Sequence, residues 1–230
     1  MAMRVYSVGA QEVTTERPRP AYELSKRAFD LIAASVGLLL LGPIMLVTAL
    51  LVKLDSPGPV LYLGRRVGRY GKAFLIYKFR TMRPDSERHG TTTAKDDPRI
   101  TRFGTFLRRY KLDEFPQLLN VLKGEMSIVG PRPEVEEHTN AYSAEERCIL
   151  DINPGITDYS SMYFVNLADV LGSDNAHHRF VHGNIRNQKN QLRLRYVRNR
   201  SFLEDLKIIL KTLAVLVRQN RTAPGTPLRP

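Results

Sequence analysis

The chain has little cysteine and comparatively few acidic residues, and each shortage excludes a class of protein. A single cysteine, Cys148, among 230 residues rules out an internal disulfide framework and suits a reducing compartment. Asp and Glu together number 23 against 35 Lys and Arg, which leaves a net charge of +12. The expected partners are therefore anionic: nucleic acid, acidic lipid headgroups or a phosphorylated substrate.

The longest stretch that lacks any charge runs from Leu31 to Val52, and it is long enough to form a membrane helix. Basic residues lie on both sides of it, which favours a membrane surface over nucleic acid as the anionic partner. Gly42 and Pro43 lie near its middle, where a proline removes a helical hydrogen bond and bends the helix. The segment either spans the bilayer with a kink or enters and leaves by the same face, and length permits both topologies.

The rest of the chain divides around this segment. Residues 1–20 and 219–230 are polar, contain several prolines and are expected to be flexible. Residues 21–56 form the expected membrane element, and 57–218 are long enough for one domain with its own core.

Local patterns predict an α+β fold that is mainly helical and has one small hairpin. Strands are expected at 60–63 and 73–77, joined by a glycine-rich and arginine-rich loop. Apolar residues recur at helical spacing over 201–218, which predicts an amphipathic helix. Such a helix either packs on the core of the domain or lies in the membrane interface.

Two adjacent carboxylates, Asp113 and Glu114, precede a short apolar run that ends at Gly124. The pattern predicts a short helix with both carboxylates at its N-terminus, where backbone N–H groups and the positive end of the dipole gather. Arg132, which lies between two prolines, adds a cation with a rigid backbone. This set suits phosphate and magnesium chemistry, although helix capping is the ordinary role of such an Asp.

Other charged residues gather in clusters that are usually solvated faces. Lys78 and Arg80 follow the second predicted strand, and a basic run from Arg108 to Lys111 leads into the carboxylate pair. His178 and His182 have the spacing of two zinc ligands on a helix, but no third ligand is evident, so we interpret them as surface residues.

Several longer motifs follow one another between about Tyr22 and Val217. They are Lys-Arg-Ala-Phe-Asp at 26–30, Ile-Tyr-Lys-Phe-Arg-Thr-Met at 76–82, Asp-Pro-Arg-Ile-Thr-Arg at 97–102, the block at 112–133, Asn-Pro-Gly-Ile-Thr at 153–157 and Ser-Phe-Leu-Glu-Asp-Leu-Lys at 201–207. Together they resemble the bacterial monotopic phosphoglycosyl transferases, also called bacterial sugar transferases. So many matches in order favour a catalytic role for Asp113 over a capping role.

The resemblance implies an enzyme that transfers a sugar 1-phosphate from a UDP-sugar to undecaprenyl phosphate and releases UMP, as the first membrane step of surface glycan or glycoconjugate assembly. It implies that Asp113 is the nucleophile of a covalent phosphosugar intermediate, that Glu114 completes the catalytic pair, and that both hold Mg²⁺. The residues that it implies for substrate binding are Lys78, Arg80, Arg108, Arg132 and Pro133.

The resemblance also implies a re-entrant membrane helix broken at Gly42 and Pro43, where the family has a Ser-Pro pair. The catalytic domain would lie on the cytoplasmic face of the bacterial inner membrane, among membrane lipids, without a nucleic-acid partner; a second copy of the chain is a further candidate partner. The segment Asp158 to Ser161 and Arg193 depart from the family pattern and bear on substrate recognition, so the sugar is not carried over.

Two alternatives remain open at this point. The first is a non-catalytic basic membrane protein that binds anionic lipid or nucleic acid and needs neither Asp113 nor Mg²⁺. The second is a transferase with the same chemistry whose membrane helix spans the bilayer.

Overall fold

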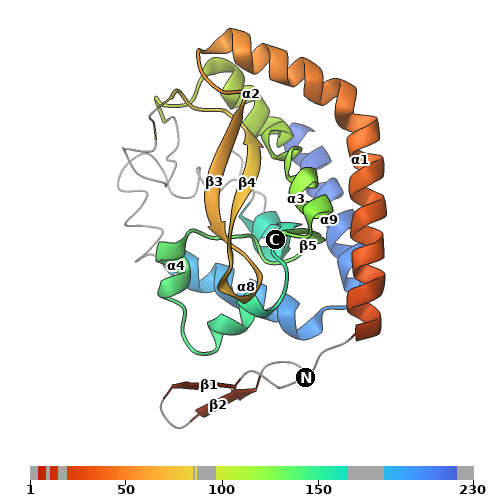
Figure 1. Cartoon of the computed structure of the whole chain (residues 1–230), viewed down its shortest axis with the longest axis vertical. Coiled ribbons are helices and arrows are strands. Elements are labelled where there is room, and N and C mark those ends of the chain that lie inside the picture. The colour runs from red at the N-terminus through yellow and green to blue at the C-terminus, as the bar shows by residue number, and fades with distance from the viewer. Residues whose placement is uncertain are drawn as a thin grey trace.

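The computed structural model describes residues 5–8, 11–14, 20–84, 86, 97–164 and 184–221 (Figure 1). The α-helices are α1 (Pro20–Asp55), α2 (Arg102–Tyr110), α3 (Gln117–Lys123), α4 (Glu136–Asn140), α5 (Tyr159–Tyr163), α8 (Ile185–Asn199) and α9 (Phe202–Arg221). Short 3₁₀ helices are η1 (Arg69–Gly71), η3 (Leu112–Glu114) and η4 (Glu146–Asp151). The strands are β1 (Val5–Val8), β2 (Gln11–Thr14), β3 (Leu61–Val67), β4 (Ala73–Phe79), β5 (Ser127–Val129) and β6 (Gly155–Thr157). The expected α+β fold with a mainly helical domain is confirmed.

The strands of the described residues form three separate pairs. β3 and β4 make the predicted antiparallel hairpin, in register from Leu61 opposite Phe79 to Val67 opposite Ala73. β1 and β2 form a second antiparallel pair within the N-terminal segment that the sequence predicted to be flexible. β5 and β6 pair in parallel and were not predicted, because strands of three residues are too short to show an alternating pattern.

Helix α1 contains the whole charge-free segment. It is the one helix of the described residues that is long and apolar enough to cross a bilayer, and only 11% of its most apolar 18-residue window is buried. The helix continues on both sides of Pro43 without an interruption, although proline has no backbone N–H to donate. Figure 1 shows instead that α1 bends sharply part-way along, and an interior proline is the usual cause of such a bend.

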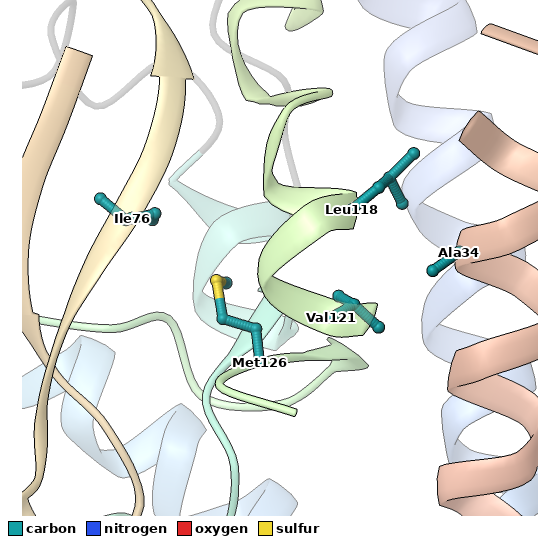
Figure 2. Close-up of a cluster of buried hydrophobic side chains, with 5 residues drawn as sticks. All are labelled: Ala34, Ile76, Leu118, Val121 and Met126. Carbon is teal, nitrogen blue, oxygen red and sulfur yellow. The ribbon is translucent and has the colours of Figure 1, made fainter. Parts of the chain in front are cut away.

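The first part of α1 packs on the helix that follows the carboxylate pair. Ala34 of α1 contacts Leu118 and Val121 of α3, while Ile76 of β4 and Met126 close the cluster from the other side. Figure 2 shows α3 lying between β4 and α1. The first part of this long apolar helix is therefore part of the hydrophobic core of the domain.

The second part of α1 packs on the same domain. Val52 joins Phe79 of β4 and Leu107 of α2 in a second buried cluster, with Met45 and Ala49 packed against it. Both parts of the bent helix thus contact one globular body.

Polar contacts fix the beginning of α1 to this body. Arg27 donates to the carbonyl oxygens of Val121 (2.6 Å) and Leu122 (2.8 Å), the last turn of α3. Asp30 Oδ1 accepts a hydrogen bond from the backbone N–H of Ile128 in β5 (3.0 Å). These bonds satisfy backbone groups that a helix end and a strand would otherwise leave unpaired.

Helix α9 confirms the amphipathic helix predicted over 201–218. A narrow face, with Asp205 and Ile208, is buried against the domain. The wider apolar face points to solvent, and its exposed members are Phe202, Leu203, Leu206, Leu210, Leu213 and Val217. Exposed apolar residues in such number mark a surface that meets another apolar phase.

Candidate active site

A left-handed residue separates α2 from the carboxylate pair. Helix α2 ends at Tyr110, and Lys111 takes the left-handed conformation with φ of 57°. The short helix η3 then carries Asp113 and Glu114, and α3 follows and ends at Gly124, where φ is 81°. The predicted helix end is confirmed. Within the described residues neither η3 nor α3 has a side-chain N-cap, so Asp113 does not serve as a cap.

Glu114 is held by two cations from distant parts of the chain. Lys78 Nζ of β4 lies 2.9 Å from its Oε1, and Arg132 donates through both terminal nitrogens, Nη1 to Oε2 (3.2 Å) and Nη2 to Oε1. Although burial alone would raise the pKa of Glu114, Arg132 and Lys78 hold that pKa well below its usual range. Glu114 is therefore a fixed anion at neutral pH.

Asp113 has the opposite environment, although it is the adjacent residue. Its side chain is 8% exposed, and Oδ1 is buried without a hydrogen-bond partner among the described residues. Burial, and next the negative charge of Glu114, raise the pKa of Asp113. Two neighbouring carboxylates with opposite pKa shifts are typical of a division of roles in catalysis, and Asp113 is the more basic of the two.

Further positive charge surrounds Asp113. Arg108 of α2 donates from Nε to Thr81 Oγ1 (2.9 Å), and burial lowers the pKa of its guanidinium. The charges of Lys78, Lys111 and Arg108 oppose the upward shift of the Asp113 pKa. The structure thus brings Lys78, Arg108 and Arg132 around the carboxylate pair, an arrangement that suits a phosphorylated ligand.

The parallel pair β5–β6 determines where Arg132 lies. Gly155 N donates to the carbonyl oxygen of Pro131 (3.0 Å), and Gly130 N donates to that of Thr157 (3.0 Å). A Cβ atom at Gly155 would lie 2.0 Å from Gly130 N, so the close approach requires glycine. The motif at 153–157 therefore holds the strand that leads into Arg132.

A buried polar network, which the sequence did not predict, supports the same segment from behind. Asp158 Oδ2 accepts from the backbone N–H of Arg132 (3.2 Å) and lies 3.9 Å from Arg193 Nε. Arg193, 1% exposed, forms an ion pair with Glu134, two residues beyond Arg132. Asp158 and Arg193, noted above only as departures from the family pattern, thus fix the backbone on both sides of Arg132.

Two other predicted site residues have structural positions. Arg80 is buried, and its guanidinium donates to the carbonyl oxygens of Ser56 (2.6 Å) and Pro57 (2.7 Å), just beyond the end of α1. The structure thus places Arg80 apart from the contacts of the carboxylate pair. Pro133 is buried directly after Arg132. The pair of histidines at 178 and 182 lies outside the described residues.

The residues present fit a magnesium ion in an open site. The described part of the chain contains no cluster of three or more His, Cys, Asp or Glu that would enclose a metal. Mg²⁺ usually takes one or two carboxylates and completes its shell with water and substrate phosphate. Asp113 Oδ1, which lacks a partner among the described residues, is a suitable ligand, whereas Glu114 is already neutralised by Lys78 and Arg132.

Sequence reasoning also missed Gln117, the first residue of α3. Its side chain is 0% exposed, and neither Nε2 nor Oε1 has a hydrogen-bond partner in the described structure. The only signal in the sequence is a polar residue four positions after Asp113, at a spacing that shares one helix face.

Comparisons with known proteins agree with the geometry. A family model described as bacterial sugar transferase matches residues 21–219. The chain is 37% identical over 204 residues to a UDP-N-acetylgalactosamine-undecaprenyl-phosphate N-acetylgalactosaminephosphotransferase of Aeromonas hydrophila, covering 87% of this chain and 45% of that protein. It is 40% identical over 210 residues to a UDP-glucose:undecaprenyl-phosphate glucose-1-phosphate transferase of Xanthomonas campestris pv. campestris, covering 88% of this chain and 40% of that protein.

A third relative is similar in length to this chain. The exopolysaccharide production protein ExoY of Rhizobium meliloti (strain 1021) is 37% identical over 214 residues, which cover 85% of this chain and 86% of ExoY. The chain thus spans less than half the length of the first two relatives and most of the length of the third.

Proposed function

Since the chain belongs to the bacterial sugar transferase family, we propose that it transfers a sugar 1-phosphate from a UDP-sugar to undecaprenyl phosphate and releases UMP. The names of the Aeromonas and Xanthomonas relatives share undecaprenyl phosphate as the acceptor and differ in the sugar, so the proposal specifies the reaction and not the sugar. The observation that carries it is the Asp113 carboxylate, buried and basic beside an ion-paired Glu114 and three fixed cations.

The first chemical step is donor cleavage. An oxygen of the Asp113 carboxylate attacks the phosphorus that carries the sugar. The bond from that phosphorus to the bridging oxygen breaks, and its electron pair leaves with UMP. Asp113 then holds the sugar phosphate as a mixed anhydride.

The second step regenerates the enzyme. A phosphate oxygen of the acceptor lipid attacks the same phosphorus, and the Asp113 carboxylate leaves as the anion. Division into two steps lets a water-soluble donor leave before a membrane-bound acceptor reacts. Arg108, Lys78 and Arg132 supply fixed positive charge for the phosphate oxygens in both steps, and Glu114 holds two of these cations in place.

Mg²⁺ is the proposed cofactor, held by Asp113 and near Glu114. When bound, it supplies neutralisation of the diphosphate oxygens and of the leaving UMP. Glu114 itself acts through its ion pairs, because its low pKa keeps it anionic at working pH.

The membrane topology proposed for α1 is re-entrant, with the catalytic domain on the cytoplasmic face. A spanning helix would place its two ends on opposite sides of the bilayer. Here Ala34, before Pro43, and Val52, after it, both pack on the same globular domain. The bend at the middle of the apolar segment supports the same topology. The exposed apolar face of α9 would then lie in the membrane interface.

The test of the reaction omits the acceptor lipid. Purified protein in detergent is mixed with Mg²⁺ and each member of a panel of UDP-sugars. The accepted donor should release up to one equivalent of UMP and leave one sugar phosphate on the protein, measured by intact mass and mapped to Asp113. Asp113→Asn should lose both signals, and Asp151→Asn, which alters a carboxylate outside the site, should keep them.

Two results would change the proposal. If UMP appears only when undecaprenyl phosphate is present, and no adduct can be trapped, the lipid phosphate attacks the donor directly. If no UDP-sugar is consumed with or without the lipid, and binding to anionic vesicles is unaffected by Asp113→Asn, the chain is a lipid-binding protein rather than a transferase.

A further inference from the structure

Gln117 combines complete burial with an unpaired amide. Neither of its polar side-chain atoms has a hydrogen-bond partner among the residues that the structure describes, although the side chain is 0% exposed. Buried polar groups in folded proteins are nearly always paired, because a group that gives up its water without a new partner destabilises the fold. The position of Gln117 therefore requires an explanation other than stability.

The backbone places Gln117 on the same face as the carboxylate pair. Phe115 (φ −56°, ψ −36°) and Pro116 (φ −60°, ψ −16°) continue the right-handed helical path from η3 into α3. Residues three and four apart on such a path are neighbours on one face. Gln117 is three residues after Glu114 and four after Asp113, so its side chain lies one turn below both.

This face is directed toward strand β4. Glu114 contacts Lys78 of β4, as described above. Asn120 lies three residues after Gln117 on α3. It accepts from the backbone N–H of Tyr77 (3.0 Å) and donates to the carbonyl oxygen of Leu75 (2.7 Å). Gln117 lies between these two anchored side chains, which explains its burial but leaves its amide without a structural task.

The missing partner of Gln117 has a counterpart on the same face. Asp113 Oδ1 is a buried acceptor that lacks a donor, and Gln117 Nε2 is a buried donor that lacks an acceptor, in the described part of the protein. Amide and carboxylate side chains four residues apart are a favourable pair on a helix. A carboxylate oxygen has two lone pairs, so Oδ1 can accept from Gln117 Nε2 and still face a magnesium ion.

We propose, on the basis of the function given above, that Gln117 is a positioning residue whose Nε2 donates to Asp113 Oδ1 when the UDP-sugar is bound. The bond directs Oδ2 toward the phosphorus. As the phosphosugar forms on Oδ2, Oδ1 becomes the carbonyl oxygen of the mixed anhydride and keeps the same donor. Gln117 fixes the orientation of the attacking carboxylate and makes no contact with the donor itself. Its loss should therefore slow the chemical step more than it weakens donor binding.

The test uses the fact that the unpaired amide destabilises the protein when no donor is bound. Gln117→Met keeps the length of the side chain and removes the amide. In the absence of donor, its Tm should rise by about 2–12 °C, because a buried unpaired polar group is gone. In single-turnover mixing with the UDP-sugar, the rate of adduct formation should fall roughly 10-fold to 100-fold, the worth of one hydrogen bond to a charged group. The donor concentration for half-maximal rate should change by less than about 3-fold.

Asn120→Leu is the matched control for stability. Asn120 is also fully buried on α3, but its amide is bonded to β4, so its replacement should lower the Tm. A fall of Tm in Gln117→Met like that of Asn120→Leu, or an unchanged rate of adduct formation, would overturn the proposal for Gln117. Failure of the wild-type protein to form an adduct with any UDP-sugar would instead overturn the covalent reaction itself.

Discussion

Replacement of Glu134 by Gln should destabilise the protein more than any other single change in the network behind Arg132. Glu134 accepts the ion pair of Arg193 and lies 3.6 Å from Lys189 Nζ and 3.1 Å from His138 Nδ1. The neutral amide would leave Arg193 with Asp158 at 3.9 Å as its remaining carboxylate partner in this network. A buried charge left without its partner costs about 3–5 kcal/mol.

The opposite replacement, Arg193→Met, should lower the free energy of unfolding by less. Glu134 would keep its contacts with Lys189 and His138, so the protein loses one charge-assisted hydrogen bond, about 1.5–3 kcal/mol. The double variant should cost less than the sum of the two single variants, because the two residues act as one pair. For a chain of this length the Glu134→Gln change corresponds to a fall in Tm of about 6–20 °C.

Thermal unfolding of the detergent-solubilised protein measures all three variants, with urea titration as a second probe. Although burial alone would raise the pKa of Glu134, the charges of Arg193 and Lys189 hold that pKa well below its usual range. The contribution of Glu134 to the free energy of unfolding is therefore present at neutral pH and is lost as pH falls through the low pKa of the folded state. Equal costs for Glu134→Gln and Arg193→Met, or a double variant equal to the sum, would refute the reasoning that Glu134 is the shared centre of this network.

Three further predictions concern charge and topology. Burial lowers the pKa of Lys189 to about 8, below its ordinary value of 10.5, so the unfolded chain binds more protons between these two pH values and the free energy of unfolding should rise with pH there. Lys189→Met should remove this rise, and an unchanged slope of the free energy of unfolding against pH would contradict the prediction. In a Cys148→Ser background, Val5→Cys and Ser56→Cys should both resist a membrane-impermeant thiol reagent in intact cells, whereas labelling at position 5 alone would indicate a spanning helix. Pro43→Ala restores a hydrogen bond and should straighten α1, with exposure of position 5 and loss of activity; unchanged topology would show that the bend is encoded elsewhere.

Features encoded by neighbouring residues were predictable from the sequence. The end of α3 depends on Gly124, which takes the left-handed conformation after a short apolar run. The hairpin β3–β4 and the helix α9 follow from the spacing of their own apolar residues. The carboxylate pair and Arg132 were found because each lies in a motif with a local physical signature.

Features that depend on distant partners were not predictable. Glu134 and Arg193 are 59 residues apart, and the sequence around either residue does not indicate the other as its partner. Arg80 shares a motif with Lys78, so the sequence assigned both to substrate binding, yet Lys78 contacts Glu114 and Arg80 holds the end of α1. Two residues of one short motif thus have different contacts, Lys78 with the carboxylate pair and Arg80 with the end of α1, and only packing separates them.

The packing of α1 on α3 limits how the membrane segment can be exchanged between proteins. Ala34 is a core residue of the catalytic domain, and Arg27 holds the last turn of the helix that begins beside the carboxylate pair. A chimera that carries the anchor of another transferase would also have to import the residues that face it, such as Leu118 and Val121, or accept a cavity next to α3. We therefore expect substitutions in α1 and α3 to be coupled, and a chain without α1 to have an incomplete core.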